Sequence, residues 1–260
     1  TEGCETGTVE FRDVSFRYPH AAADELEHIS FRVERGQTLA IIGATGSGKT
    51  TLAGLIPRFY DATQGAVLVD GVDVRDYTFD ALYDRLGYVT QKAVLFSGTV
   101  QDNIFFGQSE AADTDETLQQ ALQLSQAAEF VDRYPEKAAH PIAQLGRNVS
   151  GGQKQRLSIA RALARRPEIL IFDDSFSALD YKTDATLREG LAKQLPGTTK
   201  IIVAQRISTI RHADQILVLD RGEIAGLGTH DALMASCPVY REIAMSQLSE
   251  EELKKGGASK

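Results

Sequence analysis

The sequence predicts an α/β protein built on a largely parallel sheet, and three features of its 260 residues point to this fold class. The run Leu39–Ile42 is continuously apolar and leads into a glycine-rich loop, as a buried parallel strand does. Residues 91–149 carry mainly helical patterning, which predicts an inserted helical segment. From residue 151 onward, helical and strand-like patterns alternate as they do in βα units.

The first elements are two strands. Val9–Tyr18 alternates between apolar and polar residues, and a slip in the alternation at Arg12-Asp13 predicts a bulge or turn. A second alternating stretch covers 29–33, and 34–36 is expected to be a turn.

The later elements are predicted from the same apolar periodicity and from the proline and glycine residues that end helices and strands. Pro57 is expected to end or kink a helix that begins after the glycine-rich loop. A charged, glycine-rich tail at Ser249–Lys260 is expected to be frayed or disordered. The expected elements are a helix at Thr50–Ile56, a strand at Leu86–Thr90, a helix at Gln153–Arg166, a strand at Ile169–Asp173, a helix at Thr183–Gln194, a strand at Lys200–Ala204 and a hairpin at Gln215–Gly228.

Composition limits the classes of function. A formal net charge of −8 argues against generic nucleic-acid binding. Cys4 and Cys237 form no framework of paired or metal-binding cysteines, so two free thiols in a reducing compartment are expected. No apolar run approaches the roughly 18–20 residues that span a bilayer. The chain itself is therefore expected to be soluble, and any membrane role depends on another segment or subunit.

The segment Gly43–Thr50 matches the pattern G-x-x-x-x-G-K-[ST], a P-loop that binds the phosphates of ATP or GTP. It lies between a predicted strand and a predicted helix, as phosphate binding requires. Its glycines allow successive backbone N–H groups to point at phosphate oxygens, and the helix N-terminus adds its dipole. Lys49 is expected to reach the β- and γ-phosphates, and the Thr50 hydroxyl is expected to bind Mg²⁺. The alternative is a flexible Gly/Ser turn, which the coincidence of motif, strand and helix disfavours.

Asp173 ends the apolar strand Ile169–Asp173, which is the position of a carboxylate that holds Mg²⁺ in P-loop proteins. On its own, such an Asp is more often a cap of the following turn. The P-loop earlier in the chain favours the magnesium interpretation.

The segment Asn148–Arg156 resembles the signature of ABC ATPases, whose usual form is L-S-G-G-Q, with Val149 in place of Leu. Ser150, Gly151 and Gly152 open a predicted helix, and Gln153 follows them, so free N–H groups and a positive dipole end face an anion. The resemblance covers about residues 8–245. It implies a P-loop NTPase (RecA-like) core at 8–91 and 151–245 with an N-terminal antiparallel β subdomain, an inserted α-helical subdomain at 92–150, and a flexible tail at 246–260.

The same resemblance implies roles for further residues. Tyr18 matches the aromatic residue that stacks on adenine, although a core tyrosine in a strand is a comparable interpretation without the family. Gln91 matches the glutamine that reaches Mg²⁺, and Asp180 ends a loop that crosses the dimer interface. The predicted ATP-binding set also contains Thr51. The segments typical of the exporter branch are Arg58–Asp61, Leu95–Val100, Asp102–Ile104 and Gly228–His230.

Two positions depart from the family pattern. Asp174 stands where the general base is normally Glu, and its carboxylate is one methylene shorter, roughly 1–1.5 Å short of the usual position, an error that can cost about 10²-fold in rate. Gln205 stands where a His contacts the γ-phosphate, and an amide cannot carry a positive charge. With Lys49, these two residues form the predicted catalytic set. The sequence therefore predicts a site that binds Mg-ATP and hydrolyses it slowly.

The resemblance implies that two such chains sandwich two nucleotides head to tail, with the Ser150 turn of each completing the partner's site. One degenerate site and a near-consensus signature favour a heterodimer, while a homodimer with two slow sites stays open. The expected partners are a second ATP-binding domain and the membrane domain of an exporter, with the chain on the cytoplasmic side of the cell membrane. The alternatives are a regulatory module without hydrolysis and a soluble ABC ATPase of DNA repair or translation.

Overall fold

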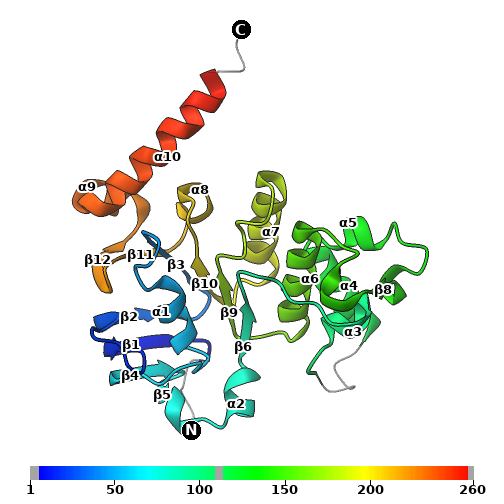
Figure 1. Ribbon diagram of the computed structural model, residues 1–260, viewed down its shortest axis with the longest axis horizontal. Coiled ribbons are helices and arrows are strands. Elements are labelled where there is room, and N and C mark those ends of the chain that lie inside the picture. The colour runs from blue at the N-terminus through cyan, green and yellow to red at the C-terminus, as the bar shows by residue number, and fades with distance from the viewer. Residues whose placement is uncertain (1–5, 109–113, 257–260) are drawn as a thin grey trace. The chain divides into compact units, whose positions relative to one another are not determined.

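The chain folds into two compact units in the computed structural model, which describes residues 6–108 and 114–256. The second unit is the continuous stretch 79–199, and the remainder of the chain forms the first unit. The predicted helical subdomain at 92–150 falls within this second unit, together with the strands Leu86–Val89 and Ile169–Asp173, which are labelled β6 and β9 in Figure 1.

The first unit contains two groups of strands and the helices that follow them. Its elements are β1 (Val9–Phe16), β2 (Leu26–Val33), β3 (Thr38–Gly43), α1 (Lys49–Leu55), β4 (Gln64–Val69), β5 (Val72–Asp73), the 3₁₀ turn η1 (Val74–Asp76), β10 (Thr199–Val203, which starts at the boundary), α8 (Ile207–Ile210), β11 (Gln215–Asp220), β12 (Glu223–Gly228), α9 (His230–Ser236) and α10 (Pro238–Gly256).

An antiparallel sheet of order β2-β1-β4-β5 forms the expected N-terminal β subdomain. The predicted bulge is confirmed, because the register of β1 shifts between Phe11 and Val14 and Asp13 has a φ of 47°. One face of the sheet is buried, with the Phe11 and Phe31 rings stacked at 4.6 Å.

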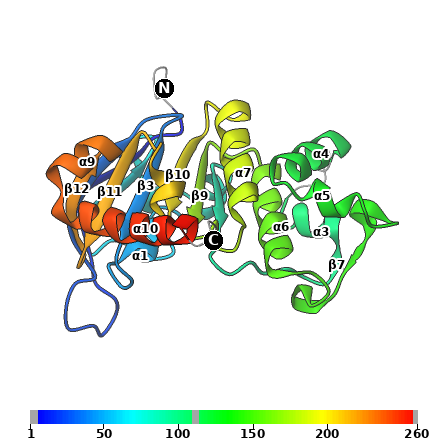
Figure 2. The same ribbon diagram turned by 90° about the horizontal axis from the view of Figure 1, so that it is seen from above.

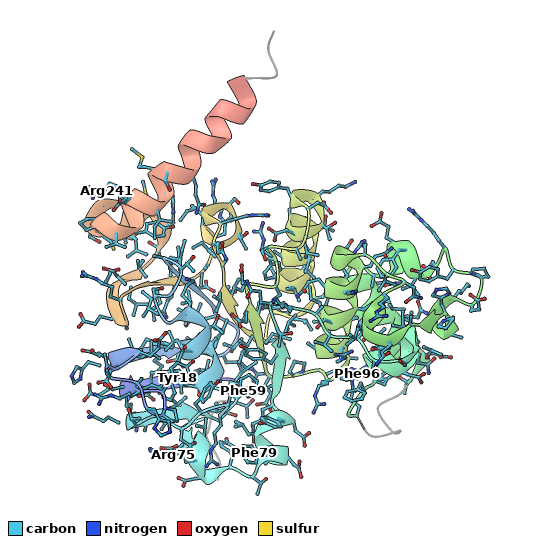
Figure 3. All side chains as sticks on the ribbon, viewed as in Figure 1. Tyr18, Phe59, Arg75, Phe79, Phe96 and Arg241 are labelled. Atoms are coloured by element: carbon cyan, nitrogen blue, oxygen red, sulfur yellow. The ribbon has the colours of Figure 1, made fainter. Side chains whose placement is uncertain are left out.

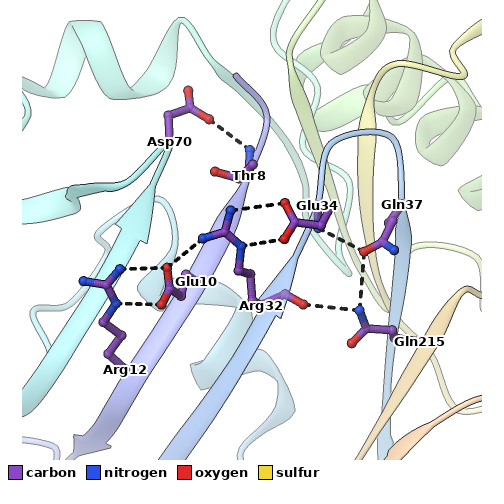
Figure 4. Close-up of polar contacts among 8 residues, drawn as sticks. All are labelled: Thr8, Glu10, Arg12, Arg32, Glu34, Gln37, Asp70 and Gln215. Carbon is purple, nitrogen blue, oxygen red and sulfur yellow. Dashed lines mark hydrogen bonds and ion pairs between the residues drawn. The ribbon is translucent and has the colours of Figure 1, made fainter. Parts of the chain in front are cut away.

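The other face of this sheet carries a ladder of charges (Figure 4). Arg12 pairs with Glu10 at 2.6 Å, and Arg32 bridges Glu10 at 3.3 Å and Glu34 at 2.6 Å. Exposed pairs of this kind contribute about 0–1 kcal/mol each. The packing of the apolar face therefore accounts for most of the sheet's stability.

The strands β12, β11, β3 and β10 run side by side in that order (Figure 2). β3 pairs in parallel with both β10 and β11, and its residues Leu39–Ile42 are at most 1% exposed. β11 and β12 form the predicted hairpin. The expected buried parallel strand before the glycine-rich loop is thus confirmed, and the loop emerges at the carboxyl end of β3.

The second unit pairs a short parallel sheet with a group of helices. In it β6 and β9 are parallel, with Tyr88 opposite Ile171. Its elements are α2 (Phe79–Tyr83), β6 (Leu86–Val89), β7 (Gly98–Thr99), α3 (Val100–Ile104), α4 (Asp115–Leu124), α5 (Ala128–Val131), η3 (Lys137–Ala139), β8 (Pro141–Ile142), η4 (Gln144–Gly146), α6 (Gly151–Ala164), β9 (Ile169–Asp173) and α7 (Tyr181–Gln194).

The C-terminal segment differs from its expectation. A flexible tail was expected from residue 246, but α10 continues to Gly256, and residues 257–260 lie outside the described part. Cys237 is buried with a free thiol, and Cys4 lies outside the described residues. Among the described helices, none is both long and apolar enough to cross a bilayer.

Candidate functional site

The P-loop joins β3 to α1 in the first unit, and its glycines are required by geometry. Gly46 and Gly48 have φ of 78° and 96°, in the left-handed region that side chains disfavour. A Cβ on Gly43 would lie 2.1 Å from the carbonyl oxygen of Leu219, a severe clash. The backbone conformation therefore favours glycine at Gly46 and Gly48, and the close approach of Leu219 requires it at Gly43.

The interior of the loop contains an orphaned polar group. The Ser47 side chain is 3% exposed, and its Oγ has no hydrogen-bond partner among the described residues. Lys49 donates from Nζ to the carbonyl oxygens of Gly43, at 2.9 Å, and Ala44, at 2.7 Å. A buried hydroxyl without a partner is costly, and a lysine ammonium lies over the same loop. Both observations fit a loop that accepts an anion.

Tyr18 lies beside the start of α1 (Figure 3). Its hydroxyl and Thr51 Oγ1 are 2.8 Å apart, so a hydrogen bond links two predicted ATP-binding residues. The ring packs edge-on against Phe16 at 4.8 Å and Tyr60 at 5.2 Å. Sequence reasoning did not identify Tyr60 as a support for this ring, although it belongs to a segment typical of exporters. Thr45, Gly46 and Thr50 are exposed on the loop and the first turn of α1.

Gln205 follows β10 and is exposed, and α10 holds its backbone. The Gln247 amide donates from Nε2 to the Gln205 carbonyl oxygen at 2.5 Å and accepts at Oε1 from the Ile207 N–H at 2.7 Å. One side chain of the last helix thereby satisfies two backbone groups of the loop. Nothing in the sequence pattern indicated this contact, because it joins residues about forty positions apart.

In the second unit, two adjacent carboxylates lie at the end of β9. Asp173 and Asp174 are 5% and 7% exposed, and Asp174 has a φ of 49°. Gln91 Nε2 donates to Asp174 Oδ2 at 3.0 Å, and the Tyr88 hydroxyl donates to Asp173 Oδ2 at 3.1 Å. Gln91 and Asp174 were predicted from the sequence. Tyr88 was not, because its contact with Asp173 joins residues 85 positions apart in the chain.

The Tyr88 hydroxyl is a donor at neutral pH. Burial, with the neighbouring Asp173 charge, raises the pKa of Tyr88 above its ordinary value. A tyrosine that stays protonated offers its hydrogen to the carboxylate, which is acceptor-only when ionised.

The residues present suit a hard cation with oxygen ligands. The described residues contain no group of three or more His, Cys, Asp and Glu side chains that could hold a metal by themselves. Mg²⁺ is usually bound through one or two carboxylates together with substrate phosphates, so a buried Asp173 is a sufficient protein contribution. The donor set therefore fits Mg²⁺ that arrives with a nucleotide.

The predicted signature begins α6. Ser150 is its N-cap, with Oγ accepting from the Gln153 N–H at 3.3 Å, while Gln153 Oε1 accepts from the Ser150 N–H at 2.8 Å. The helix begins at Gly151, two residues earlier than expected, because this reciprocal cap replaces a looser turn. No acidic residue occupies the first turn, and a Cβ on Gly151 would meet nothing within 4 Å. The positive end of α6 thus has open space over Gly151.

Asp180 caps α7 in a similar way. Its carboxylate accepts from the Thr183 N–H at 3.0 Å and from the Thr183 hydroxyl at 2.7 Å. These bonds, led by the one from the Thr183 backbone, lower the pKa of Asp180. Within this chain, Asp180 is therefore a helix cap, and its predicted place in a dimer interface stays a prediction.

Comparison with known proteins gives the family. A family model described as "ABC transporter" matches residues 26–177, more than half of the chain. The chain belongs to the ABC transporter family. The predicted resemblance and fold class are confirmed.

Individual relatives indicate which kind of ABC transporter protein this chain is similar to. An uncharacterised ABC transporter ATP-binding protein of Mycobacterium tuberculosis (strain ATCC 25618 / H37Rv) is 48% identical over 93% of this chain and 41% of its own length. An ATP-dependent lipid A-core flippase of Aromatoleum aromaticum is 42% identical over 95% of this chain and 41% of its own length.

A solved structure of a bacterial Atm1-family ABC exporter with ATP bound matches with a TM-score of 0.86 and 37% identity, over 91% of this chain and 41% of that one. The chain spans about two-fifths of the length of these relatives. It is an ATP-binding domain of the ABC family, of the type found in exporters.

Proposed function

We propose that this chain is the ATP-binding motor domain of an ABC exporter, and that it binds Mg-ATP tightly and hydrolyses it slowly at its own site. The observation that carries the proposal is the P-loop, where the buried Ser47 hydroxyl has no partner in the described part of the chain and Lys49 lies over the loop. Family membership makes ATP the expected nucleotide.

The first unit supplies most of the nucleotide contacts. The backbone amides of the P-loop and the Ser47 hydroxyl surround the phosphates, and Lys49 exchanges its bonds to loop carbonyls for phosphate oxygens. Tyr18, held by Thr51 and braced by Tyr60, offers its ring to adenine. The remaining contacts in this proposal come from Gly43, Thr45, Gly46, Gly48 and Thr50.

Thr50, Gln91 and Asp173 are the residues that hold Mg²⁺ in this proposal, through a hydroxyl, an amide oxygen and a carboxylate. Mg²⁺ held by these residues would neutralise charge that develops on the phosphates during phosphoryl transfer. Asp173 contributes a carboxylate whose Oδ2 already accepts a hydrogen bond from Tyr88.

Slow hydrolysis follows from Asp174 and Gln205. The side chain of Asp174 is one methylene shorter than the Glu usual at this position. Its Oδ2 also accepts a hydrogen bond from Gln91, which makes that oxygen less available as a general base. Gln205 offers an amide and no cation. Losing general base catalysis alone typically costs about 10²–10⁴-fold.

Transport requires partners that this chain does not contain. The Ser150–Gln153 turn and Asp180 face a second ATP-binding domain in the proposed head-to-tail dimer. A heterodimer is favoured because the chain pairs a weakened catalytic set with an intact signature, and a homodimer with two slow sites is the alternative. The relatives are more than twice as long as this chain, which supports a membrane domain as the second partner and a place on the cytoplasmic side of a membrane. In this proposal, ATP closes the dimer of ATP-binding domains, and this closure drives substrate export by moving the attached membrane domain.

A second candidate is a regulatory ATP-binding module in which nothing is hydrolysed, and the replacements Asp174 and Gln205 favour it over a soluble ABC ATPase of DNA repair or translation. The net charge of −8 argues against the latter.

Lys49→Ala tests nucleotide binding directly. We expect its affinity for Mg-ATP, measured by calorimetry, to fall at least about tenfold, because charge-assisted hydrogen bonds contribute about 1.5–3 kcal/mol. Lys193→Ala is the matched control, since Lys193 pairs only across an exposed helix face with Glu189 at 2.6 Å. The proposal fails if the parent chain has no measurable affinity for Mg-ATP, or if Lys49→Ala binds as tightly as the parent.

A further inference from the structure

Tyr88 contacts the carboxylate proposed to hold Mg²⁺. β6 and β9 are parallel neighbours with Tyr88 opposite Ile171, so the ring lies along β9 and its hydroxyl reaches the last residue of that strand. The hydroxyl donates to Asp173 Oδ2 at 3.1 Å. Asp173 is 5% exposed, so this bond lies in surroundings where water screens it little.

A hydrogen bond to one oxygen of a carboxylate fixes the direction of the other. Donation to Oδ2 restricts rotation of the Asp173 carboxylate about its last bond and leaves Oδ1 pointing in a defined direction. Bonds from a neutral hydroxyl to a carboxylate are among the stronger hydrogen bonds in proteins. Groups that orient a metal ligand in this way typically change metal affinity by about 10–100-fold when they are lost.

We propose that Tyr88 is a positioning residue for Mg²⁺, whose hydroxyl orients the Asp173 carboxylate toward the cation that accompanies ATP. The inference rests on the proposed function, because it requires that the chain bind Mg-ATP. It adds a specific role for a tyrosine on β6, a strand that contributes none of the predicted site residues. Tyr88 does not touch the nucleotide in this proposal and acts only through Asp173.

Tyr88→Phe tests the role, because it removes the hydroxyl that contacts Asp173 and keeps the aromatic ring. Binding of a fluorescent ATP analogue is titrated with MgCl₂, and separately in EDTA without metal. We expect the half-saturating Mg²⁺ concentration to rise about tenfold, while affinity in EDTA stays within about twofold of the parent. A purely structural tyrosine would weaken both alike.

Tyr77→Phe is the matched control, because its hydroxyl also donates at 3.1 Å, to the carbonyl oxygen of Val69 in the first unit. Its Mg²⁺ midpoint is expected to equal that of the parent. An unchanged midpoint in Tyr88→Phe, or an equal loss with and without Mg²⁺, overturns the inference.

A double-mutant cycle shows whether Tyr88 acts through Asp173. In an Asp173→Asn background, Tyr88→Phe is expected to have little further effect on the Mg²⁺ midpoint. An undiminished effect there contradicts the inference. A parent chain that binds no nucleotide would instead remove the proposed function, and the two failures are thereby distinguished.

Discussion

Asp174 has both an unusual side chain for its position and an unusual backbone. Its φ of 49° places it in the left-handed region, which Asp and Asn tolerate better than longer residues. Its carbonyl oxygen accepts a hydrogen bond from the Ser177 hydroxyl at 2.7 Å, which holds the turn from the backbone side. This bond does not involve the Asp174 side chain, so a Glu could project from the same backbone, although it adopts a positive φ less readily than Asp.

The double variant Asp174→Glu with Gln205→His is expected to hydrolyse ATP faster than the parent. The longer carboxylate recovers roughly 1–1.5 Å of reach, and a displacement of that size is worth about 10²-fold in rate. Phosphate release, measured with saturating Mg-ATP at high protein concentration, checks this.

The control for that experiment is Asp132→Glu, the same change at an exposed position of the second unit. The single variant Asp174→Glu is also expected to have a free energy of unfolding lower than the parent's by about 1 kcal/mol, because Glu adopts a positive φ less readily than Asp. Unchanged turnover in the double variant would mean that the slow step does not depend on these two residues, and the regulatory module would become the better interpretation.

At the scale of elements, the loop after β10 depends on the last helix. Gln247 of α10 satisfies one carbonyl and one N–H of this loop, which lies 42 and 40 residues earlier in the chain. Replacing it by Ala is expected to lower the free energy of unfolding by about 0.5–1.5 kcal/mol, because one exposed and one part-buried hydrogen bond to the backbone are lost. Urea unfolding followed by circular dichroism measures the change.

Met245→Ala serves as the comparison for Gln247→Ala, because Met245 lies two residues earlier on α10 and is 56% exposed. Its unfolding midpoint is expected to stay close to that of the parent. Equal losses in both variants would show that the helix, and not the Gln247 amide, sets the stability of this region.

Local sequence patterns predicted some of these elements and not others. Leu39–Ile42, Ile169–Asp173 and the hairpin were predictable because each depends on a local run of apolar residues with a turn beside it. Short pieces such as β7 and β8 were not predictable, since two-residue strands have no periodicity and exist only because Gly98 and Ile142 meet.

The candidate site divides in the same way. The P-loop and Asp173 were predicted from a motif and an apolar strand, and Gln91 and Asp174 from the family resemblance; the roles of all of them stay predictions. Tyr88 and Gln247 could not be predicted, because their roles depend on contacts between segments 85 and about 40 residues apart. Sequence patterns specify groups that touch a ligand, whereas the supporting contacts require the folded chain.

At the scale of the whole molecule, the proposed dimer depends on the N-terminus of α6. Its Ser150–Gln153 cap leaves the first turn without acidic residues, and nothing lies within 4 Å of a Cβ built on Gly151. A Cβ at Gly151 therefore meets no obstacle among the described residues, and in the proposed dimer it would face a nucleotide held by another protomer.

Gly151→Asp is expected to have opposite effects on folding and on assembly. A carboxylate in the first turn interacts favourably with the helix dipole, by about 0.3–1 kcal/mol, so the unfolding midpoint should stay level or rise. The same charge would repel the triphosphate of the opposite protomer, so association driven by Mg-ATP should be lost. Sedimentation velocity at high protein concentration, with and without Mg-ATP, measures association, and Gly151→Ala separates the added charge from the added bulk. If Gly151→Asp associates as readily as Gly151→Ala, the positive end of α6 does not close over a partner's nucleotide, and the head-to-tail dimer would be wrong for this chain.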